Sequence, residues 1–161
     1  MEIIIYKSHV KELGGAAVDS SNAATTYSYI ELKDGQFLKS VGVSYGLNGV
    51  LQLAFEEGEE VELHVYKSSL LSDNDNSLVL VAIKRASDKI FAFKMPISNI
   101  SIPIKIGMYL LYALGIFTIP FLGIGLILIW FGWKLRPIVK LTDELKKIKI
   151  YVDNLKDAIV I

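Results

Sequence analysis

The sequence contains no cysteine and only two histidines, His9 and His64. The lack of cysteine excludes disulfide bonds, thiol nucleophiles and thiolate metal sites. Neither histidine has the neighbours that metal or triad chemistry requires, and His64 lies in EVELHVYK, whose alternation predicts a strand. Glycine-rich phosphate-binding motifs and the GxSxG motif are absent as well. The sequence therefore predicts a protein that has no cofactor and no metal, and that is not an enzyme.

One acidic segment, SDNDNS at residues 72–77, has a partial likeness to a calcium-binding loop. It supplies Asp73 and Asp75, but LVL follows where a calcium loop needs a glycine and a distal glutamate. We therefore expect this segment to connect two strands rather than to bind calcium.

Basic residues are scarce in the first hundred residues. Nine Lys and Arg stand against thirteen Asp and Glu there, a net charge of minus four, although the whole chain is neutral. A nucleic-acid-binding surface requires the opposite sign, so we expect no nucleic-acid partner. The acidic corner from Glu56 to Glu62 is interpreted either as a surface for a basic partner or as a solvated turn.

Short runs of β-branched and aromatic residues fill the same region, and their alternation predicts strands. Turn signals separate the runs at residues 34–35, 46–49, 56–60 and 72–77. The predicted fold class is an all-β N-terminal domain over residues 1–100, either a small OB-like barrel or a sandwich. The predicted strands are TTYSYIEL, QFLKSVGV, GVLQLAF, EVELHVYK, SLVLVAIKR and KIFAFKM, with MEIIIY as a further candidate and GGAAVDSSNAATT (14–26) as a loop.

Charge is almost absent from Met108 to Leu135, where only Lys134 is charged. Leu, Ile, Phe, Gly, Tyr and Trp dominate this run, and about 20 apolar residues suffice to cross a bilayer. We therefore predict an α-helical membrane segment over residues 101–136, with a buried core helix of a soluble protein as the alternative. The first residues, MEIIIYKSHVKEL, carry charges too early for a signal peptide, so we expect residues 1–100 in the cytoplasm.

A break inside this segment leaves two topologies open. Pro120, Gly123 and Gly125 would divide it into stretches of sixteen residues, each about 24 Å long and shorter than a ~30 Å hydrocarbon core. Basic residues on both flanks favour the cytoplasmic side for both ends. We therefore expect a hairpin that thins the bilayer or dips into it, with one kinked span as the alternative. The predicted interfacial anchors are Tyr109, Tyr112, Trp130 and Trp133.

The last predicted element is an amphipathic helix over residues 137–161, with Pro137 at a favourable first-turn position. Its apolar residues recur at spacings of three and four, which is typical of a coiled-coil seam. We interpret the seam as a surface for homo-oligomerisation or for a protein partner. The alternatives are a helix packed on its own β-domain and a helix lying on membrane lipid. The seam residues are Ile138, Leu141, Leu145, Ile148, Val152, Leu155 and Ile159.

The order of these parts resembles uncharacterised bacterial inner-membrane proteins with an OB-like domain. The likeness covers most of the chain and rests on layout: the EEGEEVELHV corner, the LVLVAIKRASDKIFAF segment, a hydrophobic pair interrupted by glycine and proline, and a basic helical tail. It implies a place at the bacterial inner membrane, with the N-terminal domain and the tail in the cytoplasm. The expected function is a membrane-anchored binding or scaffold protein, such as an immunity or accessory subunit.

Two other functions are weighed against this one. Oligomerised apolar segments could form a pore, but they contain no internal acid or base to line a path. An enzyme with a membrane-facing site would need a polar cluster, which the sequence does not offer.

Overall fold

The chain divides into two compact units. The computed structural model describes residues 3–19, 24–68, 77–93, 101–118 and 124–161. The barrel unit consists of residues 1–95 together with 148–161, and the hairpin unit consists of residues 96–147. The barrel unit is therefore discontinuous in sequence.

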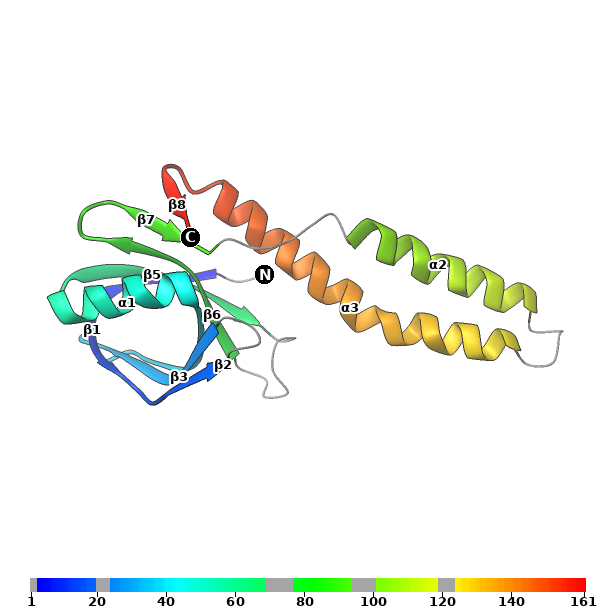
Figure 1. Ribbon diagram of the computed structural model, residues 1–161, viewed down its shortest axis with the longest axis horizontal. Coiled ribbons are helices and arrows are strands. Elements are labelled where there is room, and N and C mark those ends of the chain that lie inside the picture. The colour runs from blue at the N-terminus through cyan, green and yellow to red at the C-terminus, as the bar shows by residue number, and fades with distance from the viewer. Residues whose placement is uncertain (1–2, 20–23, 69–76, 94–100, 119–123) are drawn as a thin grey trace. The chain divides into compact units, whose positions relative to one another are not determined.

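Five strands of the barrel unit pair in a closed ring (Figure 1). They are β1 (Ile3–Leu13), β3 (Ala24–Leu32), β4 (Phe37–Ser44), β5 (Glu60–Ser68) and β6 (Ser77–Arg85). Around the ring, β1 pairs with β3, β3 with β4, β4 with β6, β6 with β5, and β5 with β1. Only the pair of β4 and β6 among these is parallel. The closed barrel confirms the predicted barrel architecture and is consistent with an OB-like domain.

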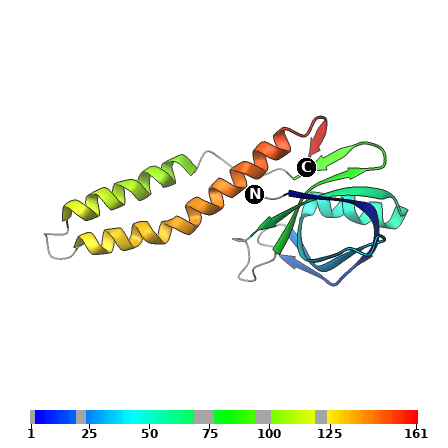
Figure 2. The same cartoon turned by 180° about the vertical axis from the view of Figure 1, so that it is seen from behind.

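A helix, α1 (Tyr45–Glu57), connects β4 to β5, and Figure 2 shows it lying against the strands of the barrel. The predicted strand GVLQLAF and the predicted turn at residues 46–49 are therefore both wrong. Leu47, Leu51 and Ala54 are at most 1% exposed, and their spacings of four and three place them on one helical face. Burial of this face in the barrel outweighs the local strand signal.

Gly58 ends α1 in the left-handed conformation, with φ at 65°. Its amide donates to the Phe55 carbonyl at 3.2 Å, and the Glu59 amide donates to the Ala54 carbonyl at 3.1 Å. A residue with a Cβ would be strained at this φ, so glycine suits the position. The acidic corner is therefore a capped helix end followed directly by β5.

Alternate side chains of β5 point to opposite faces of the sheet. Val61, Leu63 and Val65 are buried in the barrel interior together with the buried face of α1. The pairing register of β5 with β6 shifts between His64 and Val65. On β6, Leu80 and Ile83 point inward, whereas Val81 and Ala82 between them belong to a second cluster on the outer face. The bulge thus gives the barrel two apolar faces at this point.

Three shorter strands extend the sheet beyond the ring. They are β2 (Ala16–Asp19), β7 (Ile90–Ala92) and β8 (Ala158–Val160), which pair with β3, β6 and β7 respectively. The loop predicted over residues 14–26 is wrong for β2, because its small side chains give a weak strand signal while its backbone pairs with the edge of β3. Residues 72–76 of SDNDNS lie outside the described residues.

The end of α3 (Ile124–Asp153) covers the outer cluster of the barrel unit. Ile148 and Val152 are 1% and 5% exposed there. They pack with Tyr66, Val81, Ala82 and Ala92. Ile148 and Val152 therefore pack on the chain's own β-domain, as one of the alternatives for the predicted seam proposed.

The tail helix differs from its predicted bounds at both ends. Pro137 lies on the exposed surface inside α3 and does not begin a helix, although it cannot donate to the carbonyl four residues earlier. After Asp153 the chain turns, with Asp157 at a φ of 61°, and enters β8. Heptad spacing alone could not locate this end, because apolar residues continue at the same spacing through the turn.

We predict that Leu51→Ala lowers the free energy of unfolding by about 2–5 kcal/mol, because it leaves a cavity inside the barrel. Leu53→Ala is the matched control on the same helix, since Leu53 is 43% exposed. Urea denaturation of both variants followed by circular dichroism measures the difference. Equal losses in the two variants would contradict a core filled by α1.

Candidate functional site

The hairpin unit consists of α2 (Ser101–Thr118) and the part of α3 up to residue 147, which pack against each other in opposite directions. At one end of the contact, Lys105 forms an ion pair with Asp143 at 2.6 Å. Toward the other end, a Cβ added to Gly115 would lie 2.7 Å from Ile129 Cγ1. The pairing of early α2 residues with late α3 residues makes the unit an antiparallel helical hairpin.

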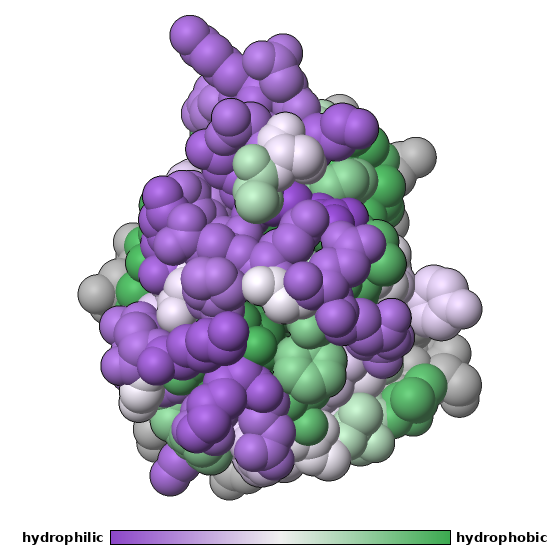
Figure 3. Space-filling model, turned by 90° about the vertical axis from the view of Figure 1, so that its left-hand side faces the viewer, coloured by the Kyte–Doolittle hydropathy of each residue, from purple (hydrophilic) through white to green (hydrophobic). Residues whose placement is uncertain are grey.

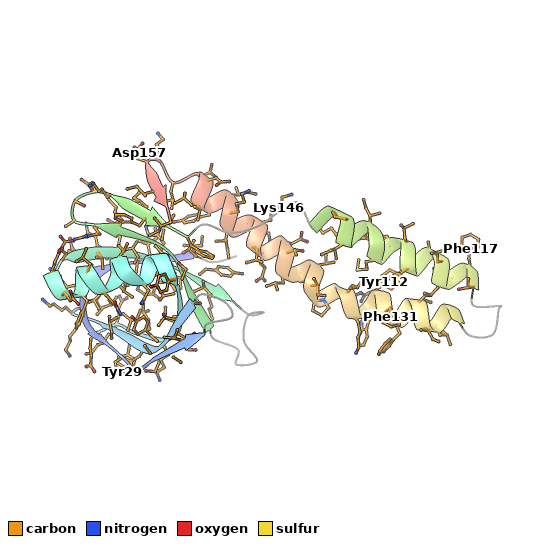
Figure 4. All side chains as sticks on the ribbon, in the orientation of Figure 1. Tyr29, Tyr112, Phe117, Phe131, Lys146 and Asp157 are labelled. Carbon is orange, nitrogen blue, oxygen red and sulfur yellow. The ribbon has the colours of Figure 1, made fainter. Side chains whose placement is uncertain are left out.

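Glycines bring the two helices close together. A Cβ on Gly115 would also lie 2.9 Å from the Gly125 carbonyl oxygen, and a Cβ on Gly132 would lie 2.7 Å from the ring of Tyr112. Tyr112 extends from α2 toward α3 (Figure 4). The predicted break residue Gly125 thus lies in the first turn of α3 at this contact, while Pro120 and Gly123 lie outside the described residues.

The outward sides of both helices carry large apolar side chains. Exposed fractions there range from 48% for Trp130 to 80% for Phe117. Three of the four predicted anchors, Tyr109, Trp130 and Trp133, are among these residues, whereas Tyr112 faces the partner helix. The exposed set is Ile106, Tyr109, Leu110, Leu114, Ile116, Phe117, Leu126, Ile127, Trp130, Phe131 and Trp133.

Within the described parts of the chain, no helix combines the length and the apolar character needed to cross a membrane.

Two cations lie just beyond the apolar part of α3, and each is held by an aromatic side chain. The Lys134 ammonium lies 4.4 Å from the centre of the Trp130 ring. Arg136 donates from Nε to the hydroxyl of Tyr112 at 3.1 Å, and its guanidinium carbon lies 5.8 Å from the centre of that ring. Both contacts have cation–π character. The hairpin thus changes from an apolar to a basic surface within a few residues.

The predicted seam does not form one continuous surface. Ile138 is 45% exposed, Leu141 and Leu145 are partly buried, and all three belong to the hairpin unit. Ile148 and Val152 are buried on the barrel unit, where Leu155 follows the helix end and Ile159 lies in β8. The structure therefore divides the seam between two units and removes its last two residues from the helix.

His64 is a buried polar residue of the barrel unit, and it contacts the end of α3. Its Nδ1 lies 2.7 Å from the hydroxyl of Tyr151 on α3, and its Nε2 is buried without a hydrogen-bond partner among the described residues. Burial lowers the pKa of His64, with Lys84 acting in the same direction and Glu62 opposing it. Burial also raises the pKa of the Tyr151 hydroxyl. The pair is suited to hold the end of α3 on the barrel while His64 is neutral.

The acidic corner is neutralised by cations of the barrel unit itself. Arg85 forms ion pairs with Glu57 and, at 2.8 Å from Nε, with Glu59, which lowers the pKa of the Glu59 carboxyl. Lys7 lies 3.9 Å from Glu60 and 3.7 Å from Glu62. A shallow cavity of about 160 Å³ lies among these charges. Because cations of the same unit pair with these carboxylates, the structure favours a solvated turn over a surface for a basic partner at the acidic corner.

Hydrophilic residues dominate the face of the molecule drawn in Figure 3, with smaller hydrophobic groups between them. Across the described residues, no group of three or more His, Asp or Glu side chains is placed to hold a metal ion.

Sequence reasoning missed the contacts of Tyr151 and Arg136. Tyr151 meets a residue 87 positions away, which no local pattern signals. The position of Arg136 directly after an apolar run does carry a signal, because cations at such ends are typical of helices that meet a membrane surface.

Comparison of this chain with models of known protein families, with curated proteins and with solved structures gives no match.

We predict that Gly115→Ala destabilises the hairpin by about 1–3 kcal/mol, because the added methyl group meets Ile129 and the backbone of α3. Gly107→Ala is the matched control in the same helix, since no atom lies within 4 Å of its added Cβ. Alanine there should stabilise α2 by roughly 0.5–1 kcal/mol. Both tryptophans of the chain lie in α3, so thermal unfolding followed by tryptophan fluorescence measures the two effects. Shifts of the same sign would contradict the close packing.

We also predict that acidification destabilises the barrel unit through His64. Its folded pKa lies below its ordinary value of 6.5, so this contribution to stability is complete above pH 6.5 and is lost as pH falls toward the folded pKa. Urea denaturation between pH 7.5 and pH 5 should show this loss in the wild type and a smaller one in His64→Phe. His9→Gln, which removes the other histidine, should keep the wild-type slope. An unchanged slope in His64→Phe would refute the assignment.

Proposed function

We propose that the chain is a non-enzymatic binding or scaffold protein attached to a membrane, in which the hairpin unit inserts into one side of a lipid bilayer. The observation that carries the proposal is the set of exposed large apolar side chains on the outward sides of α2 and α3. The barrel unit, with its paired surface charges, would remain in water and present the binding surface.

The amount of exposed apolar surface supports a covering environment. Full burial of a large apolar side chain is worth about 1.5–3 kcal/mol, and soluble monomers rarely expose contiguous apolar patches above a few hundred Å². On α2 the exposed positions occupy the arc that faces away from α3, and α3 is arranged in the same way. A bilayer covers all outward sides of a hairpin at once, which a single globular partner does not.

The lengths of the uncharged stretches favour shallow insertion. Ile106–Thr118 of α2 spans thirteen residues and Ile124–Trp133 of α3 spans ten, which is about 20 Å and about 15 Å of helix. Half of a ~30 Å hydrocarbon core is about 15 Å. We therefore propose a hairpin that enters one leaflet and returns.

The composition of the barrel unit supports the same topology. Residues 1–95 and residues 148–161 belong to one compact unit, so both ends of the hairpin segment join the same folded body. A folded body lies on one side of a bilayer, and a hairpin meets this condition. A single span would separate the two segments that share the outer cluster.

Association of several copies is a second way to cover the hairpin. The exposed Ile138 and the partly buried Leu141 and Leu145 remain available for the predicted homo-oligomer, whereas Ile148 and Val152 do not. The bilayer is the better-supported cover, because the largest exposures lie on both helices from Ile106 to Trp133 rather than along the seam.

We predict that Trp130 and Trp133 move from water into the interfacial region of the bilayer, next to the hydrocarbon, when phosphatidylcholine vesicles are added. These are the only two tryptophans, so a blue shift of emission and quenching by lipids brominated on their acyl chains report on the hairpin alone. Leu114→Asp should weaken vesicle binding about a hundred-fold, because a buried aspartate costs roughly 2.5–3.5 kcal/mol.

Leu53→Asp, on the exposed side of α1, is the matched control and should bind like the wild type. Wild-type protein that stays unbound in flotation, or that sediments as an oligomer with blue-shifted emission before vesicles are added, would refute membrane insertion.

A further inference from the structure

The charges of the chain are distributed unequally between the two units. Residues 1–95 carry nine Lys and Arg against thirteen Asp and Glu, and residues 148–161 carry two of each sign. The hairpin unit carries six Lys and Arg against Asp143 and Glu144, a net charge of plus four. Lys105 is paired with Asp143. The surplus of positive charge therefore lies in α3, directly after its apolar stretch.

Arg136 is the cation of this group that the structure holds most firmly. Its Nε donates to the Tyr112 hydroxyl, which anchors one edge of the guanidinium between the two helices. The side chain remains exposed, and its terminal nitrogens have no partner within the described ranges. A guanidinium offers five N–H donors in a planar fork that matches a phosphate group. Arg136 thus exposes the terminal nitrogens of its guanidinium at the surface of the hairpin unit.

The position of Arg136 along α3 matches the depth of lipid phosphates. It follows Trp133 by three residues, which is about 4.5 Å along the helix axis. Interfacial tryptophans lie at the level of the headgroups, next to the hydrocarbon. With Trp133 at that level, Arg136 meets the layer of phosphodiesters, and Lys140 follows on the same side of the helix one turn later.

From these observations we infer that the hairpin unit selects bilayers that contain anionic phospholipids, and that Arg136 binds a lipid phosphodiester with the free edge of its guanidinium. This inference rests on the proposed membrane insertion. Lys134 and Lys140 add positive charge on the same part of α3, each worth about 1 kcal/mol near an anionic surface. Tyr112 is a positioning residue, because it orients Arg136 without touching the lipid in this arrangement.

The test compares binding of the full chain to phosphatidylcholine vesicles with and without phosphatidylglycerol, by flotation and tryptophan emission. The wild type should bind the anionic vesicles more tightly, and added salt should reduce the difference. Arg136→Gln should lower the preference about five-fold, from a loss of about 1 kcal/mol. Arg136→Lys should lower it by less, because it keeps the charge but loses the fork. Lys33→Gln removes an exposed cation of the barrel unit and should leave the preference unchanged.

The outcomes separate this inference from the proposed function. Absence of binding to both kinds of vesicle refutes membrane insertion itself. Equal binding to both kinds refutes only the lipid preference, and full retention in Arg136→Lys refutes recognition through the guanidinium fork. Loss of the preference in inorganic phosphate at matched ionic strength would assign the site to free phosphate and overturn the lipid assignment.

Discussion

The outer apolar face of the barrel has to be covered, and residues from the far end of the sequence cover it. Tyr66, Val81, Ala82 and Ala92 would otherwise expose a second apolar surface, because the bulge in β5 and β6 turns two consecutive β6 residues outward. Ile148 and Val152 close this face, and β8 continues the sheet beside β7. Residues 96–147 are therefore an insertion between two segments of the same unit. Both ends of this insertion have to meet the barrel unit, which limits the topologies that the hairpin can adopt.

Elements with strong local alternation could be predicted from the sequence. SLVLVAIKR matches the bounds of β6, because outward and inward residues and flanking polar segments mark it clearly. The helix α1 was missed because residues 46–49 carry a turn signal and GVLQLAF resembles a strand, whereas burial in the barrel interior selects Leu47, Leu51 and Ala54 as one helical face. The residue at which α3 ends could not be predicted from the sequence either. Leu155 and Ile159 keep the heptad spacing while the backbone has already left the helix.

In the candidate site, too, some features could be predicted from neighbouring residues in the sequence, whereas others depend on contacts between distant residues. The apolar stretch, its glycines and the cations at its end are visible in the sequence, because each depends on neighbours along one helix. The contact of Tyr112 with Arg136 depends on how two helices face each other, and the contact of His64 with Tyr151 depends on the return of the chain to the barrel. Such contacts join residues whose relation is set only by the complete fold.

The discontinuity of the barrel unit also bears on the order in which the chain acquires its structure. All strands of the closed ring precede the hairpin in the sequence, whereas Ile148, Val152 and β8 follow it. During synthesis the ring can therefore close while its outer apolar face is still uncovered. The contacts that later cover this face join residues far apart in the sequence, and such contacts form slowly. The apolar hairpin leaves the ribosome within that interval. The rate at which residues 148–161 dock on the barrel, rather than the rate of ring closure, would then determine the fraction of newly made chains that avoids aggregation.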